Sequence, residues 1–118
     1  MKHGFRELLV WRQAMDLVRD SYFLTTKLPK EERYGLTSQI RRAAVSVPAN
    51  IVEGSGRRTR KDYVGFLHVA QGSLRELETL LMLTVTVELV QEEAVTSLQT
   101  QIDSVARLLN RLIQSLLP

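Results

Sequence analysis

The sequence predicts an all-α protein, an antiparallel up-and-down four-helix bundle formed by a single domain over residues 1–118. Two observations carry this prediction. Apolar residues recur at intervals of three and four in four segments, which is the period of a helix with one buried face. The chain also has only 6 glycines and 3 prolines, too few for a turn-rich all-β chain. Short connections between the segments favour a bundle whose consecutive helices run in opposite directions.

The first two helices are predicted from their apolar faces and from the residues that end them. The first runs from about Phe5 to Lys27, and Leu28–Pro29 ends it because the residue before a proline avoids helical backbone angles. The second begins near Gly35 and ends at Gly54-Ser55-Gly56. Pro48 lies inside it, where a proline costs about 3 kcal/mol, so this helix is expected to be kinked or broken near Pro48. The two faces consist of Leu8, Trp11, Met15, Val18 and Tyr22, and of Leu36, Ile40, Ala43, Val47 and Ile51.

The third and fourth helices have a clearer start and a stricter period, respectively. Thr59 is expected to cap the third helix, with Asp62 three residues on, and the helix extends to about Val87. The fourth follows a short turn around Leu89 to Gln91 and repeats its apolar residues every seven positions. Their faces consist of Tyr63, Phe66, Leu67, Ala70, Leu74, Leu77 and Leu81, and of Val95, Leu98, Ile102, Val105, Leu109, Leu112 and Leu116.

Several classes of chemistry are excluded or poorly supported. The chain has no cysteine, which excludes disulfides, zinc-thiolate sites and cysteine nucleophiles. Neither His3 nor His68 belongs to the Glu-x-x-His pattern of a di-iron bundle, and Gly54-Ser55-Gly56 lacks both a third glycine and a preceding strand. We therefore expect no metal, no cofactor and no enzymatic activity. The longest uncharged stretches, residues 43–52 and 79–87, are about half of the ~20 residues that cross a membrane, so a cytoplasmic protein without membrane contact is expected.

Charge is distributed unevenly along the chain. Residues 1–62 have a net charge of +6, and residues 63–118 have a net charge of −3. Four cations fall within five residues, and two more stand together on the second helix: Arg57, Arg58, Arg60 and Lys61, and Arg41 and Arg42. Such a run fits a site for phosphates, but it equally fits a solvated stretch that pairs with Glu53, Asp62 or a neighbouring subunit. No aromatic residue interrupts the run, so base stacking is not predicted there.

Several sequence blocks resemble one family. They are Val10-Trp11-Arg12, the Gln39-Ile40-Arg41-Arg42-Ala43-Ala44 block, the Pro48-Ala49-Asn50-Ile51-Val52-Glu53-Gly54 block and Gly72-Ser73-Leu74-Arg75-Glu76-Leu77-Glu78. The chain is similar to the four-helix-bundle proteins encoded in bacterial 23S rRNA intervening sequences, which are related to the accessory proteins of diversity-generating retroelements. One departure is the missing glycine in the turn before the last helix, Val87-Glu88-Leu89-Val90.

The resemblance implies a homopentamer with no established catalytic activity, and its relatives bind nucleic acid and a reverse transcriptase. The positions that match the family are Arg41, Arg42, Asn50, Glu53 and Gly54. Asn50 and Glu53 lie one turn apart just past Pro48. They either bind a ligand or satisfy backbone groups that the proline frees.

These observations lead to one functional hypothesis and one alternative. The hypothesis is a non-enzymatic homo-oligomer whose basic surface binds structured nucleic acid, with RNA expected, through Arg41, Arg42, Arg57, Arg58, Arg60 and Lys61. A ring would repeat this surface and raise affinity through avidity. The alternative is a protein-binding scaffold or accessory subunit, for example of a reverse transcriptase, whose basic run contacts that partner or another subunit. Wide apolar faces on short helices favour oligomerisation in either case.

Overall fold

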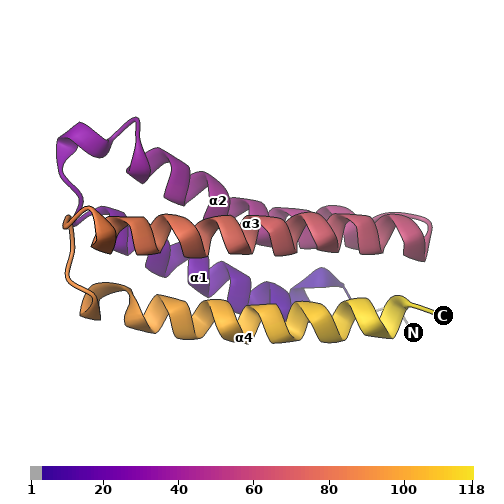
Figure 1. The fold of residues 1–118 in the computed structure, drawn as a ribbon. Helices are drawn as coiled ribbons and strands as arrows, with labels where there is room; N and C mark the ends of the chain where they lie inside the picture. The colour runs from indigo at the N-terminus through magenta and orange to yellow at the C-terminus, as the bar shows by residue number, and fades with distance from the viewer. Residues whose placement is uncertain (1–3) are drawn as a thin grey trace.

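Four antiparallel helices form the bundle, which confirms the predicted fold class (Figure 1). The computed structural model describes residues 4–118 and measures 47 × 24 × 20 Å. Its long helices are α1 (Leu9–Thr25), α2 (Leu36–Ser55), α3 (Arg60–Thr86) and α4 (Glu93–Leu116), with two 3-10 turns, η1 (Phe5–Glu7) and η2 (Lys30–Glu32). Each helix contacts the next, and α4 closes the bundle against α1. The C-terminus and η1 lie at the end of the bundle that carries the α2–α3 turn (Figure 1).

The start and the buried face of the first helix differ from the prediction. Leu8 has extended backbone angles (φ −72°, ψ 123°) and separates η1 from α1. Because the chain breaks there, Phe5 meets Trp11 edge-on with ring centroids 5.2 Å apart, which one continuous helix would prevent. Met15 and Tyr22, which belong to the predicted face of α1, are exposed. The buried residues of α1 are Val10, Ala14, Leu17, Ser21, Leu24 and Thr25.

Helix α2 is continuous through Pro48, so of the two outcomes expected there, a kink or a break, the break does not occur. The predicted kink fits the ribbon, in which α2 slopes toward α3 over its first half and then runs alongside it (Figure 1). Its core positions Ile40, Ala43, Val47 and Ile51 are buried as predicted. Gly56 follows the last helical residue with φ −89°, so the helix ends there without the left-handed residue that a glycine permits.

The turn between α3 and α4 explains the departure from the family at Glu88. This residue has φ 63°, and it is the only described non-glycine residue with positive φ. The amide of Leu89 donates to the Thr84 carbonyl and the amide of Glu88 donates to the Val85 carbonyl, both at 2.9 Å. This is a Schellman motif, in which glycine usually occupies the left-handed position. The backbone therefore retains the geometry of a glycine turn with a glutamate in place of the glycine.

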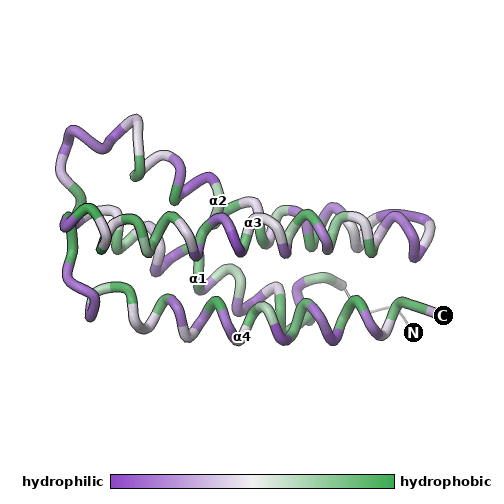
Figure 2. Tube along the Cα trace, viewed as in Figure 1, coloured by the Kyte–Doolittle hydropathy of each residue, from purple (hydrophilic) through white to green (hydrophobic). Residues whose placement is uncertain are grey.

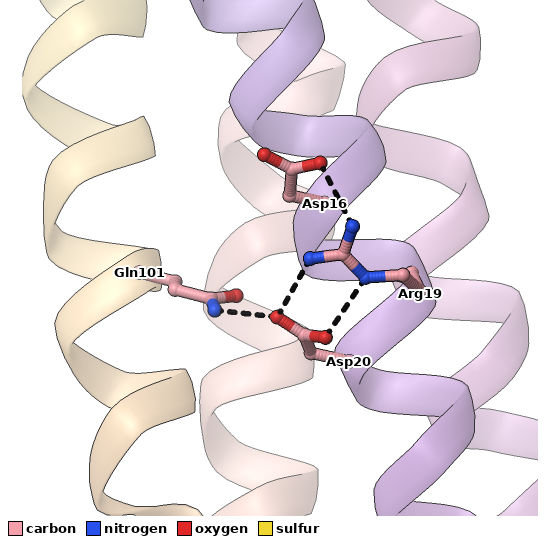
Figure 3. A network of polar contacts seen from close by, with 4 residues as sticks. All are labelled: Asp16, Arg19, Asp20 and Gln101. Carbon is pink, nitrogen blue, oxygen red and sulfur yellow. Dashed lines mark hydrogen bonds and ion pairs between the residues drawn. The ribbon is translucent and has the colours of Figure 1, made fainter.

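Helices α1 and α4 are joined by polar side chains over a buried apolar core. The Gln101 amide donates to Asp20 Oδ2 at 2.7 Å, and Arg19 contacts both Asp20 and Asp16 (Figure 3). The hydrogen bonds from Arg19 and Gln101 lower the pKa of Asp20 below its ordinary value. Two turns earlier along α1, Ser104 Oγ donates to Gln13 Oε1 at 2.7 Å. These two bonds fix the register of α4 on α1.

Helices α2 and α3 approach closely because their contact residues are small. Ser46 Oγ and Ser73 Oγ are 2.7 Å apart, and Gly54 lies against the first turns of α3. A Cβ at Gly54 would stand 2.9 Å from Tyr63 Cδ1, 3.0 Å from Phe66 Cβ and 3.1 Å from the Tyr63 carbonyl oxygen. A side chain at this position therefore forces the two helices apart.

We predict that Gly54→Ala lowers the free energy of unfolding by about 1–3 kcal/mol, because overpacking against backbone and a ring cannot be relieved by a side-chain rotation. The matched control is Gly72→Ala, also inside a helix, where a Cβ meets nothing within 4 Å. That variant should gain about 0.5–1 kcal/mol from reduced chain entropy. Urea denaturation followed by circular dichroism measures both, and equal stabilities for the two variants would contradict the close-approach argument.

Candidate nucleic-acid interface

The basic run lies at the end of the bundle between α2 and α3. Arg57 and Arg58 are in the turn, and Arg60 and Lys61 begin α3. All four residues are exposed, and Figure 2 shows this turn as a hydrophilic segment of the tube. Thr59 caps α3 as predicted, because its Oγ1 accepts a hydrogen bond from the Asp62 amide at 3.1 Å. The cap thus fixes the backbone at the centre of the run.

Arg57 is held in place, whereas the other three cations are free. Its Nη2 lies 3.5 Å from Glu53 Oε1, and its guanidinium stacks 4.6 Å above the centroid of the Phe66 ring. Within residues 4–118, the side chains of Arg58, Arg60 and Lys61 form no hydrogen bond or ion pair. Of the expected partners within the chain, Glu53 pairs with Arg57, and neither Glu53 nor Asp62 pairs with the other three cations.

Arg41 and Arg42 lie away from the basic run. Arg41 stands 14 residues before the end of α2 at Ser55, which corresponds to about 20 Å along the helix axis. Its Nε donates to Thr25 Oγ1 at 3.0 Å, and its guanidinium lies 4.6 Å above the Tyr22 ring, so it ties α2 to α1. Arg42 points into solvent without such contacts. The six predicted residues consequently form two groups rather than one patch.

The family-matching residues beside Pro48 have packing roles in the structure. The Asn50 amide donates to the Ser46 carbonyl oxygen at 2.8 Å and to Ser46 Oγ at 2.9 Å. Pro48 instead frees the carbonyl of Ala44, four residues earlier, so Asn50 does not satisfy the group that the proline leaves unpaired. Glu53 pairs with Arg57 and does not contact the proline turn. Asn50 orients the Ser46 hydroxyl that contacts α3, and Gly54 allows the helices to approach.

Aromatic residues surround the basic run in space, although none interrupts it in the sequence. Phe5 from η1 and Tyr63 from α3 line a surface hollow of about 410 Å³ together with Leu8, Ser55, Arg57, Arg58, Thr59 and Arg60. Burial raises the pKa of the Tyr63 phenol. The helical period of α3 places Tyr63 three residues after Arg60, a signal available in the sequence, but nothing in the sequence indicates that Phe5 joins them.

Other site types find no support in the part of the chain that the structure describes. No group of three or more histidines, aspartates or glutamates is arranged to hold a metal ion among residues 4–118. His68 Nδ1 lies 3.0 Å from Gln71 Oε1 on the same exposed helix face. No helix within residues 4–118 is both long enough and apolar enough to span a membrane.

The fold and the exposed cations define an all-α bundle with a basic end. The profile of the 23S rRNA-intervening sequence protein family matches residues 6–111. The chain therefore belongs to that family. A crystal structure from Bacteroides thetaiotaomicron, of a protein with unknown function from the S23 ribosomal protein family, superposes with a TM-score of 0.79. It is 22% identical, and the match covers 89% of this chain and 98% of that one, which supports the fold. No curated protein sequence matches the chain.

We predict that Arg41→Ala lowers the free energy of unfolding by about 1 kcal/mol or more, because it removes a half-buried stacking contact and a hydrogen bond to Thr25. Arg42→Ala removes the same charge from the next residue and should change stability by less than about 0.5 kcal/mol. Urea denaturation of the two variants checks this difference. If Arg41 only bound a ligand and had no structural role, both variants would be as stable as the wild type.

Proposed function

We propose that this protein is a non-enzymatic binder of structured nucleic acid, with RNA expected, and that it contacts phosphates through the basic run. The observation that supports this proposal is the exposure of Arg58, Arg60 and Lys61 without any counter-ion from the described chain. Three unpaired cations at a helix N-terminus repel one another and oppose the helix dipole. Phosphate groups relieve both costs and also accept hydrogen bonds from guanidinium groups.

The contact is expected to recognise shape rather than base sequence. Helix α3 carries the run at its first turn, at the end of the bundle and away from its sides. Base reading in a groove usually places a helix face or strand pair along the nucleic acid, which four cations in a turn do not provide. Phosphates and 2′-hydroxyls of folded RNA are compatible with such a compact basic end.

We further propose that the protein acts as a homo-oligomer, and the resemblance to the family implies a pentamer. The supporting observation is a stripe along α3 and its C-cap residue, on the side away from the buried face, that contains one charged residue in seven positions. These positions are Gly65, Val69, Gly72, Glu76, Thr79, Leu83 and Val87, with Val69 52%, Leu83 38% and Val87 53% exposed. A long, weakly polar helix face of this kind usually marks an interface. Repetition of the basic end around a ring would add avidity.

The RNA proposal is tested with a fluorescently labelled RNA hairpin, by anisotropy over a series of salt concentrations. We expect Arg58→Gln/Arg60→Gln/Lys61→Gln to weaken binding and to reduce the slope of log affinity against log salt by about 2–3. The matched control is Lys27→Gln/Lys30→Gln/Arg33→Gln, which removes three exposed cations at the opposite end. Equal losses for the two triple variants, or none for the first, would overturn the assignment of the run.

The oligomer proposal is tested by sedimentation velocity. We expect Leu83→Glu to shift the protein toward the monomer mass, because it replaces an exposed apolar residue of the α3 stripe with a charge. Met15→Glu, a change at an equally exposed apolar residue on α1, should leave the mass unchanged. If the subunits associate through apolar contacts, the measured mass of the assembly should change little at high salt. If they associate through their basic and acidic halves, the assembly should weaken as salt screens the charges.

The alternative, a protein-binding scaffold or accessory subunit such as one that serves a reverse transcriptase, is favoured by the same α3 stripe. It predicts that purified protein fails to bind the hairpin even at low salt, while Leu83→Glu still alters assembly. Hairpin binding separates the two alternatives, because both predict that Leu83→Glu alters assembly.

A further inference from the structure

We propose that the hollow beside the basic run, lined by Phe5, Tyr63, Arg58 and Arg60, binds one nucleotide, with its phosphate on the arginines and its base against the aromatic side chains. The inference deepens the proposed function and rests on it for the source of the nucleotide. That source is either a free nucleoside monophosphate or an unpaired terminal nucleotide of an RNA strand. The chemistry of recognition is the same for both.

The hollow is large enough for such a ligand and is built from segments far apart in the sequence. Its volume of about 410 Å³ lies within the range of about 300–1,000 Å³ found for small-molecule sites. η1 supplies Phe5, the end of α2 supplies Ser55, the turn supplies Arg57 and Arg58, and α3 supplies Arg60 and Tyr63. The break at Leu8 allows η1 to lie beside the turn, and Leu8 itself also lines the hollow. A continuous first helix would not form this wall.

Three of the residues that line the hollow are cationic. Arg58 and Arg60 have no partner among the described side chains, while Arg57 contacts Glu53 and Phe66. Guanidinium groups match the charge and the planar hydrogen-bonding geometry of a phosphate monoester. Arg60 is also the first residue of α3, whose N-terminus carries a partial positive charge.

Two of the residues that line the hollow, Phe5 and Tyr63, are aromatic. The Phe5 ring is already oriented by the Trp11 edge at 5.2 Å and by the Arg6 guanidinium 5.0 Å from its centroid. Tyr63 is half-buried, and its hydroxyl forms no hydrogen bond with residues 4–118, so it is available to a polar group of a base or ribose. A tyrosine hydroxyl is protonated at neutral pH, and burial raises the pKa of this phenol further. A bare phosphate or an acidic peptide engages only the arginines, whereas a nucleotide also engages the aromatic residues.

Trp11 provides a direct readout, because it is the single tryptophan of the chain and touches Phe5. We expect AMP to change its fluorescence saturably and to bind at least about tenfold more tightly than ribose 5-phosphate, which lacks the base. Adenosine, which lacks the phosphate, should also bind more weakly than AMP. Equal affinities of AMP and ribose 5-phosphate would reduce the site to a phosphate site and overturn the proposal. The absence of any saturable binding of AMP would overturn it as well.

Hairpins distinguish an RNA terminus from a free nucleotide. We expect the wild type to bind a hairpin with an unpaired 3′ nucleotide about tenfold more tightly than the same hairpin with a blunt end. Phe5→Leu keeps an apolar side chain in η1 and should abolish this preference. Phe23→Leu is the control, because Phe23 is an exposed aromatic residue near the other end of α1.

The possible results separate failure of this inference from failure of the proposed function. Tight binding of both hairpins without preference, together with weak AMP binding, would reject the nucleotide site and leave phosphate binding by the run intact. Saturable AMP binding without hairpin binding would reject the RNA proposal and assign the hollow to a free nucleotide. Retention of the overhang preference in Phe5→Leu would reject the role of the aromatic wall.

Discussion

The close approach of α2 and α3 at Gly54 is the constraint on which the basic end depends. A side chain at residue 54 would meet Tyr63 and the first turns of α3 at distances that real Cβ atoms rarely show. Because α2 ends one residue later and α3 begins at Arg60, the separation of the two helices sets the span of the turn. It therefore also sets the spacing of Arg57, Arg58 and Arg60 and the position of Tyr63 beside them. The packing of α2 against α3 therefore determines the geometry of the candidate site.

The helices themselves could be predicted from the sequence, except where small or polar residues occupy the core. The regular faces of α3 and α4 and the Thr59 cap are correct because large aliphatic residues and a capping threonine give strong signals. The face of α1 was misplaced because Met15 and Tyr22 are larger and more apolar than Ala14 and Ser21, which occupy the buried positions. Small residues are favoured where two helices pack closely, and the spacing of large apolar residues does not identify such positions.

The candidate site was predictable in part. The basic run is local in sequence, so its exposure at the end of a helix and the capping of α3 follow from adjacent residues. Arg41 and Arg42 stand apart from the run, because each residue of a helix adds 1.5 Å of distance along its axis. The aromatic residues beside the run were missed because Phe5 reaches the turn through the break at Leu8, and the apolar spacing of the first helix does not indicate that break.

The distribution of partners within the basic run gives the strongest argument that the run has a ligand. The hydrogen bond between Thr59 and the Asp62 amide caps α3, and Glu53 pairs with Arg57. Arg58, Arg60 and Lys61 take part in neither interaction, and their three positive charges oppose the helix dipole. Neutral residues at the three positions would give a more stable monomer. A group that binds only the folded chain and carries negative charge recovers this cost, and binding and stability are then linked at the same three residues.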